Sequence, residues 1–264
     1  MNKDLERKIY LKKLKKEKIF IKVIQLSILI LFILIWQILS NYNIINSFLC
    51  SSPLKVLKTV IELINSNELL PNLLITFEEI IISFILSSLI AFLIAIILWY
   101  FPITNKILEP YLTILNSLPK VALGPIIIIW AGANNKSIIL MSLLISTFSS
   151  IISIYTSFIG TNKTYIRLLK SMKANKFKIL TYSVIPSNIS TIISSLKINL
   201  SMTFVGVIMG ELLVSKQGLG YLINYGSQVF NTNLVITSII ILCILTSILY
   251  LVIVIIERKI KETH

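Results

Sequence analysis

Histidine and cysteine are nearly absent from this sequence. The 264 residues include one histidine, His264, and two cysteines, Cys50 and Cys243. Two distant cysteines make no disulfide framework, and no cluster of these residues has the spacing of a metal-ligand set. The composition therefore argues against a zinc or haem site.

A phosphate-binding loop is also missing. The stretches "GANNKS" and "GTNKT" place a lysine before Ser or Thr, but both lack the glycines of such a loop. Carboxylates are rare in the apolar runs, where Glu78, Glu79 and Glu211 lie only near the outer ends. Proton-coupled carriers usually bury ionisable relays near mid-membrane. We therefore expect no cofactor on this chain, and uphill transport would need energy from a partner.

Apolar residues are what the sequence has in abundance. They make up 56% of the chain, whereas charged residues make up 14%, about half the share of a soluble domain. A span needs about 20 mainly apolar residues. The sequence thus predicts an all-α, polytopic membrane protein with about six transmembrane helices, near 19–40, 73–101, 110–130, 137–159, 190–213 and 234–256.

The third of these runs, "NSLPKVALGPIIIIW", contains Pro119, Lys120 and Pro125. Proline removes a helix hydrogen bond. We expect a broken or tilted span whose irregular backbone faces protein or a water-filled cavity.

Basic residues set the predicted orientation. If the N-terminus is inside, eighteen Lys and Arg lie on the inner side against four on the outer side. The net charge of +14 therefore reflects topology and not nucleic-acid binding. Residues 1–18 are predicted to be a basic cytosolic tail, and residues 19–264 a membrane domain with both termini in the cytosol. The run from Ile19 to Leu39 is too long for a cleavable signal core, so we interpret it as a retained span.

On the outer side, "SSPLKVLKTVIELI" begins with Ser52 as an N-cap and Pro53 at the first helical position. Apolar residues then recur at helical spacing, which predicts an amphipathic helix on the membrane surface. A solvated linker with accidental periodicity is the alternative.

The stretch "KSMKANKFKILTYSVIPSNIS" lies in the main inner loop. Six basic residues occur between Gly160 and Pro186 with no acidic partner among them. Each would cost about 2.5–3.5 kcal/mol in mid-bilayer. This loop must therefore lie outside the membrane, on the cytosolic side.

The same loop resembles the cytoplasmic loop of ABC-importer permeases, whose pattern is Glu-Ala-Ala, three residues, Gly, and a Pro after an apolar run. Pro186 matches the family proline, Phe177 a common aromatic position, and Ala174 the residue after the glycine. The sequence departs from the pattern at residues 167–169, which read Arg-Leu-Leu, and at Lys173, which replaces the glycine.

The downstream spacing strengthens the resemblance. Lys197 follows Pro186 by eleven residues and Glu211 follows fourteen later, both at family positions, and the "GLG" of Gly218 and Gly220 comes next. Upstream, "SLPKVALGPIIIIWAGA" and "CSSPLKVLKTV" are similar to the nitrate/sulfonate/taurine branch. The resemblance covers roughly residues 48–256.

The resemblance implies a type I ABC importer (MetI-like) transmembrane domain in a bacterial plasma membrane. It implies a non-catalytic subunit that forms a homodimer, with two ATP-binding subunits inside, which carry ATP and Mg, and a solute-binding protein outside. The solute would be a sulfonate, nitrate, taurine or a related small molecule, or a thiamine precursor. The rivals are a self-sufficient secondary carrier or channel, and a scaffold without transport.

The resemblance also implies that residues 160–186 couple this chain to the ATPase. Helix-in-groove docking needs apolar anchors at helical spacing with polar flanks. The predicted coupling residues are Tyr165, Ile166, Leu169, Met172, Ala174, Asn175, Lys176, Phe177, Leu180 and Pro186. Asn175 tolerates a left-handed conformation, so we expect it to replace the missing glycine at the bend. The alternative is a basic inner loop that serves only topology.

Seven further positions are candidates for a structural or a pathway role. Gly206 and Gly210 form a small-x-x-x-small pair, which suits close helix packing or the lining of the path. Lys120 would either hold an anionic solute or snorkel toward the inner interface. Glu211 would order the outer end of its span or take part in gating. Pro119, Gly218 and Gly220 complete the candidate set.

Overall fold

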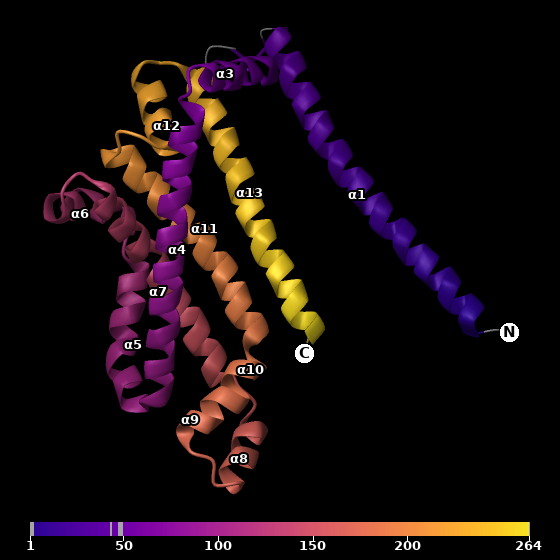
Figure 1. Cartoon of the computed structure of the whole chain (residues 1–264), viewed down its shortest axis with the longest axis vertical. Coiled ribbons are helices and arrows are strands. Elements are labelled where there is room, and N and C mark those ends of the chain that lie inside the picture. Colours follow the sequence, from indigo (N-terminus) through magenta and orange to yellow (C-terminus); the bar gives the residue numbers. More distant parts are fainter. Residues whose placement is uncertain (1–2, 43, 47–49, 264) are drawn as a thin grey trace.

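The computed structural model describes residues 3–42, 44–46 and 50–263, and every regular element among them is helical (Figure 1). In chain order the elements are α1 (Lys3–Asn41), α3 (Pro53–Asn65), α4 (Leu69–Tyr100), α5 (Pro102–Ser117), η1 (Lys120–Leu123), α6 (Gly124–Ala131), α7 (Asn135–Ile159), α8 (Lys163–Ser171), α9 (Lys176–Ile179), the π-helical η2 (Leu180–Val184), α10 (Ile185–Ser187), α11 (Ile189–Val214), α12 (Leu219–Gln228) and α13 (Thr232–Thr263).

Five described helices are long and apolar enough to cross a membrane, or up to six if the bent pair α5 and η1–α6 counts as one span. The two halves of that pair meet at 85°. This confirms the predicted break in the third span. The span also begins earlier than expected, at Pro102, because Pro102 starts a new helix directly after α4 ends.

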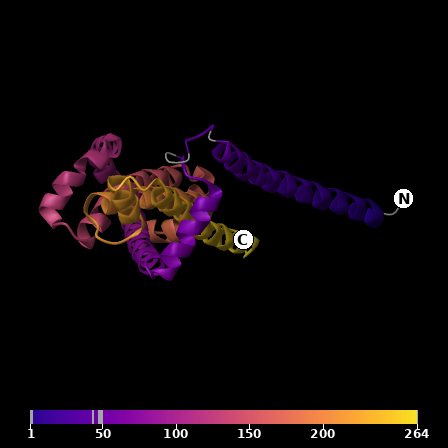
Figure 2. The ribbon, with the colours of Figure 1, turned by 90° about the horizontal axis from the view of Figure 1, so that it is seen from above.

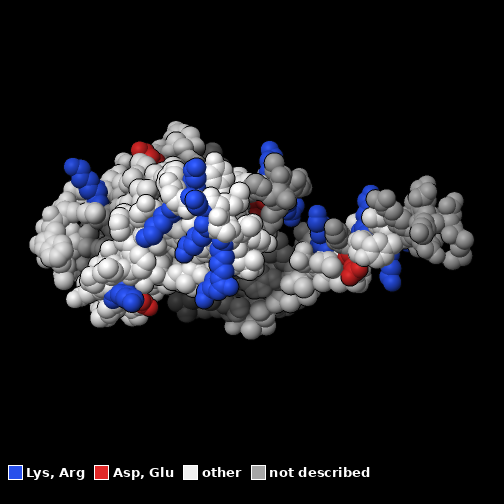
Figure 3. Space-filling model, turned by 90° about the horizontal axis from the view of Figure 1, so that it is seen from below, with Lys and Arg blue, Asp and Glu red and all other residues white. Residues whose placement is uncertain are grey.

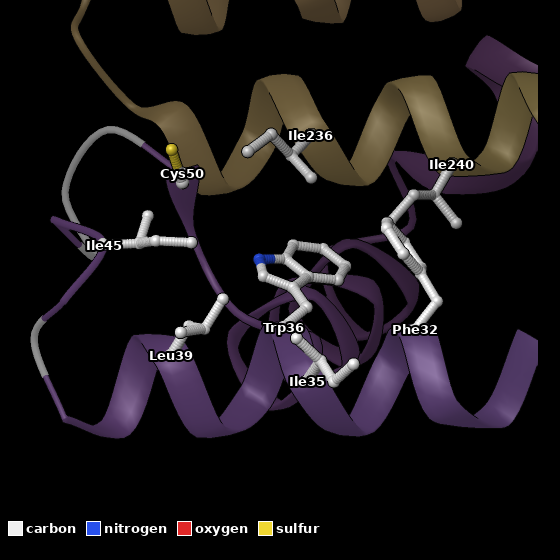
Figure 4. Close-up of a pocket in the computed structure, with 8 residues that line it drawn as sticks. All are labelled: Phe32, Ile35, Trp36, Leu39, Ile45, Cys50, Ile236 and Ile240. Carbon is white, nitrogen blue, oxygen red and sulfur yellow. The ribbon is translucent and has the colours of Figure 1, made fainter.

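The first helix stands away from the rest of the bundle (Figures 1 and 2). It is continuous from Lys3, so most of the predicted tail is helical and runs directly into the first span. Near the C-terminal end of α1, this helix and α13 border a groove of about 380 Å³ (Figure 4). Its lining is apolar and includes Phe32, Trp36 and Ile240, which is the lining expected where acyl chains replace water.

The predicted surface helix forms as α3. The Ser52 hydroxyl accepts a hydrogen bond from the Lys55 backbone N–H (3.3 Å), and Pro53 begins the helix. Its apolar stripe, represented by Leu54 and Ile61, is exposed, while Leu63 is buried. An exposed apolar stripe at the end of the bundle fits a helix that lies on a membrane surface.

The core of the bundle is the packing of α7 against α11 and α4. Gly206 and Gly210 lie where α11 approaches α7 most closely: a Cβ on Gly206 would be 2.4 Å from the Cα of Ser142, and one on Gly210 would be 2.9 Å from the Cα of Ile138. Ser142 also donates a hydrogen bond to the Thr203 carbonyl (3.2 Å). Both glycines are therefore packing positions buried against a neighbouring helix.

Candidate functional site

The segment between α7 and α11 projects beyond the end of the bundle as α8, α9, η2 and α10 (Figure 1). Asn188 joins the two ends of this segment. Its side-chain amide donates to the Thr161 hydroxyl (2.7 Å) and to the Val184 carbonyl (2.7 Å). The projecting loop is therefore closed at its base, and the sequence pattern gave no sign of this contact.

The bend after α8 is made by Lys173 and not by Asn175. Lys173 has a φ of 57°, its N–H donates to the Lys170 carbonyl (2.9 Å), and the Ala174 N–H donates to the Leu169 carbonyl (3.0 Å). This pair of bonds is the Schellman motif, which needs a left-handed residue at the position that Lys173 occupies.

The prediction that Asn175 provides the left-handed bend is therefore wrong. Asn175 has extended backbone angles (φ −73°, ψ 167°). Its side-chain oxygen accepts from the Lys178 N–H (2.8 Å), so it is the N-cap of α9. Lys173, which aligns with the family glycine, adopts the conformation that the glycine would favour.

The predicted apolar stripe divides into two faces. Leu180 is buried, and Ile166, Leu169 and Ala174 are partly buried against a cluster from α4 and α7 that includes Leu98 and Phe158. These four residues of the loop hold it to the bundle. They are not available to a partner.

The outward face of the loop keeps its apolar residues exposed. Tyr165, Met172 and Phe177 are 55%, 71% and 63% exposed. The sequence reading missed Leu168 and Tyr182, which are 58% and 74% exposed. These five exposed residues, here called the outward face, lie on α8, α9, η2 and the turn that follows α8.

Basic side chains are abundant at this end of the molecule. Viewed from the loop end, Lys and Arg gather over the body with few acidic residues among them (Figure 3). Lys176 has a further contact: its ammonium donates to the Tyr100 carbonyl (3.3 Å) and lies 5.4 Å from the Tyr100 ring centre. Lys176 thus ties α9 to the end of α4. Pro186 is exposed in α10, directly after the π-helical turn.

At the opposite end, Glu211 is fully buried and binds two other segments. One carboxylate oxygen accepts from the Thr76 hydroxyl (2.6 Å) and the other from the Gly220 N–H (2.5 Å). A Cβ on Gly218, which has a φ of 112°, or on Gly220 would lie within 2.7 Å of Glu211 side-chain atoms. Both glycines are therefore needed where the chain passes over this carboxylate.

Two neighbours of Glu211 were not found from the sequence. Asn72 accepts from the Gly218 N–H (2.7 Å), and Thr76 accepts from the Leu219 N–H (2.8 Å). The hydrogen bonds of Asn72, Thr76 and Glu211, here called the outer staple, join α4, α11 and the start of α12.

Two of the lysines within or beside the spans, Lys120 and Lys197, contact neighbouring helices. Lys197 forms an ion pair with Glu257 on α13. Lys120 follows Pro119 at the bend of the third span. Its ammonium donates to the Asn116 side-chain oxygen (3.2 Å) and to the Ile145 carbonyl (3.2 Å).

Among the described residues, no three His, Cys, Asp or Glu side chains gather in a group that could hold a metal ion. The chemistry of this chain is that of packed helices, a projecting loop and a hydrogen-bonded outer end. These features define a polytopic helical membrane protein.

The family is shown by comparison with known proteins. The chain belongs to the family described as "Binding-protein-dependent transport system inner membrane component", whose model matches residues 87–262. The protein is accordingly the permease of an ABC importer, a non-catalytic membrane subunit whose ATPase is a separate chain.

Individual relatives differ in what their names say they transport. The chain is 25% identical over 230 residues to a permease of Bacillus subtilis (strain 168) named SsuC and associated by name with aliphatic sulfonates, with 87% of this chain and 83% of the relative covered. It is 26% identical to the formylaminopyrimidine transport permease protein ThiX of Halalkalibacterium halodurans, with 73% and 76% covered.

A solved structure supports the fold. A chain of the MetNI methionine ABC transporter in inward-facing conformations matches with a TM-score of 0.59 and 16% sequence identity. The match covers 74% of this chain and 94% of that one. The predicted MetI-like architecture is therefore confirmed.

Proposed function

We propose that two copies of this chain form the path of an ABC importer, with two ATP-binding subunits against their projecting loops and a solute-binding protein at the other end. ATP and Mg are held by the ATP-binding subunits. The loop and both termini are cytosolic in this proposal, as the excess of inner basic residues requires.

The outward face of the loop is the observation that carries the proposal. Tyr165, Met172 and Phe177 are exposed on a segment that also bears six basic residues and so lies outside the bilayer. Apolar side chains in water are costly unless a partner covers them. A groove on a protein partner would bury them at helical spacing, with the lysines as its polar rim.

The inward face supports a mechanical role for the loop. Ile179, Leu180 and Val184 are buried together with residues of α4 and α7 such as Leu98 and Phe158. Packed interiors transmit displacement because they have little free volume. Movement of a docked ATP-binding subunit would therefore shift α4 and α7 together with the loop.

The relatives bear on the solute. A permease associated by name with aliphatic sulfonates matches over most of both chains, so we propose a small organic anion of that kind. A thiamine precursor is the second candidate, because the match to the formylaminopyrimidine permease is nearly as long.

Substitution of the outward face tests the coupling proposal. Phe177→Ala or Met172→Asp should weaken association with the ATP-binding subunit and abolish uptake, since truncation of a buried anchor costs about 2 kcal/mol or more in binding. Lys170→Gln is the matched control on the same loop, because an exposed rim charge contributes little. Co-purification of the ATP-binding subunit and solute uptake into vesicles are the measurements.

Membrane insertion should be unchanged in all three variants, because the spans and the remaining inner charges are intact. If the Phe177 and Met172 variants retained full ATPase binding and full uptake, the loop would be only a topological signal.

A further inference from the structure

Lys120 is a cation held near the middle of the membrane. Its ammonium donates to the carbonyl of Ile145 (3.2 Å), which lies ten residues after Asn135 and fourteen before Ile159 on α7. At a rise of about 1.5 Å per residue, both ends of α7 are roughly 15–20 Å away from this carbonyl. The charge is therefore far from either aqueous interface.

The partners of Lys120 are all neutral. Asn116 and the Ile145 carbonyl accept its hydrogen bonds, and the ring of Phe148 lies 5.5 Å from the ammonium. In the part of the chain that the structure describes, no carboxylate lies within 4.0 Å of it. A charge in the membrane interior is normally paired, yet Lys120 has no ionic partner among the described residues.

Among the described residues, the Lys120 ammonium and the Asn116 side-chain amide both have N–H groups that donate no hydrogen bond. An ammonium has three N–H groups, and Lys120 uses two of them. The side-chain oxygen of Asn116 accepts from both Lys120 and Ser149 (2.8 Å). Within the described ranges, the Asn116 amide nitrogen donates no hydrogen bond, whereas its side-chain oxygen accepts two. The site thus offers a cation with a remaining N–H and a neighbouring amide donor.

One side of Lys120 is left open at the bend of the third span. Lys120 is only half-buried in the single chain, and it lies at the 85° break where α5 ends and η1 begins. Irregular backbone and a charged group at membrane depth persist only where protein or a water-filled cavity covers them. Among the described residues, the recorded contacts of the ammonium are those with Asn116, Ile145 and Phe148, which leaves the open side for the path or the second copy of the proposed importer.

We infer that, in each copy of the chain, Lys120 and Asn116 form an anion-binding site midway along the translocation path, here called the station. It would take the negatively charged group of the solute, such as a sulfonate or carboxylate, through the remaining ammonium N–H and the Asn116 amide. This inference rests on the proposed function for the existence of a path, and it adds the group that selects solutes by charge.

Charge-selective thiol labelling tests the station without requiring transport. In a Cys50→Ser, Cys243→Ser background, Val121→Cys places a thiol on an exposed position next to Lys120. The permease and its ATP-binding subunits would be placed in nanodiscs. Two methanethiosulfonate reagents would be compared, one carrying an ethylsulfonate and the other an ethyltrimethylammonium group.

The ratio of the two labelling rates is the readout. A unit charge roughly 8 Å away, at an effective dielectric constant of about 30, changes the local concentration of a monovalent ion by about tenfold. The charge attracts one reagent and repels the other, so Lys120→Met should lower the anion-to-cation rate ratio at Val121→Cys by about a hundredfold, whereas Lys120→Arg should retain it. A control thiol from Trp130→Cys, at the far end of α6, should show no change with either substitution.

Two results would overturn the station. One is a Val121→Cys thiol that reacts with neither aqueous reagent, because no water-filled passage would then reach Lys120. The other is a rate ratio that Lys120→Met leaves unchanged. Because labelling needs no ATP hydrolysis, a complex that shows the charge selectivity but fails to transport would count against the importer proposal alone.

Discussion

Alanine at Gly206 tests whether the approach of α11 to α7 holds the bundle together. The added Cβ would lie 2.4 Å from the Cα and 2.9 Å from the Cβ of Ser142. Carbon atoms in contact are separated by about 3.5–4.0 Å. The two helices would therefore have to separate by roughly 1 Å, because the nearest atom belongs to the backbone and cannot rotate away.

The expected loss of stability follows from two opposed terms. Overpacking of a close-packed interior costs about 1–3 kcal/mol, and a fixed backbone neighbour places Gly206 at the upper end of that range. Alanine gains about 1 kcal/mol of helix propensity over glycine. Gly206→Ala should therefore destabilise the fold by about 1–2 kcal/mol, and Gly206→Leu by considerably more.

A graded series of glycines makes the test sharp. Gly210→Ala should destabilise less, since its Cβ would be 2.9 Å from the Cα of Ile138. Gly160→Ala is the matched control, because the nearest atoms would be at an ordinary 3.4 Å. The unfolding temperature of the detergent-purified variants should be lowest for Gly206→Ala, higher for Gly210→Ala and highest for Gly160→Ala. If Gly206→Ala unfolded at the same temperature as Gly160→Ala, the reasoning from close helix contact would be refuted.

Three further predictions concern the topology, the bend of the loop and the outer staple. On intact cells, an impermeant thiol reagent should label Cys50, outside, and not Cys243, within the last span; the reverse pattern would contradict the six-span topology. Lys173→Gly should raise the free energy of unfolding by about 1 kcal/mol, because glycine adopts the left-handed conformation without strain. Lys170→Gly, within α8, should lower the free energy of unfolding by a similar amount. Glu211→Gln should cost about 1–3 kcal/mol in the free energy of unfolding, because its amide can no longer accept from both buried donors; thermal stability equal to that of the unaltered chain would show that one acceptor suffices.

The spans were readable from the sequence because a bilayer imposes simple rules. Length and hydropathy located the long helices, and Pro119 correctly marked the broken one. Even so, the break divides the span into two helices that meet at 85°, an angle that no sequence pattern specifies. Lys120 was recognised as unusual, but its contact with Ile145 depends on how that angle brings η1 to α7.

The sequence alone could not predict which side of the projecting loop is covered by the bundle. A helical stripe predicts which residues share a face, but the position of α4 and α7 decides which face the bundle covers. Leu169 consequently packs inward while Tyr165 remains exposed. Propensity favoured Asn175 for the left-handed bend, yet the Schellman bonds of α8 impose that conformation on Lys173.

The outer staple was only half predictable for a related reason. Glu211 and its glycines were found through their spacing, since they lie close together in the sequence. Thr76 lies 135 residues before Glu211, and nothing in its local pattern distinguishes it from the other hydroxyl residues of α4. Only the packing of α4 on α11 brings the two side chains together.

The helix α11 connects the two ends of the molecule. Its inner end follows α10 and the projecting loop, where Asn188 closes the base by a hydrogen bond to Thr161. Its outer end carries Glu211, which holds α4 and the start of α12. Between these ends, Gly206 and Gly210 leave no space between α11 and α7. Because close-packed interiors transmit displacement, we expect a helix packed in this way to move as one unit. Displacement of the loop by a docked ATP-binding subunit would therefore reach the outer staple. For the outer end to open, such a movement must strain or break the hydrogen bonds of Glu211.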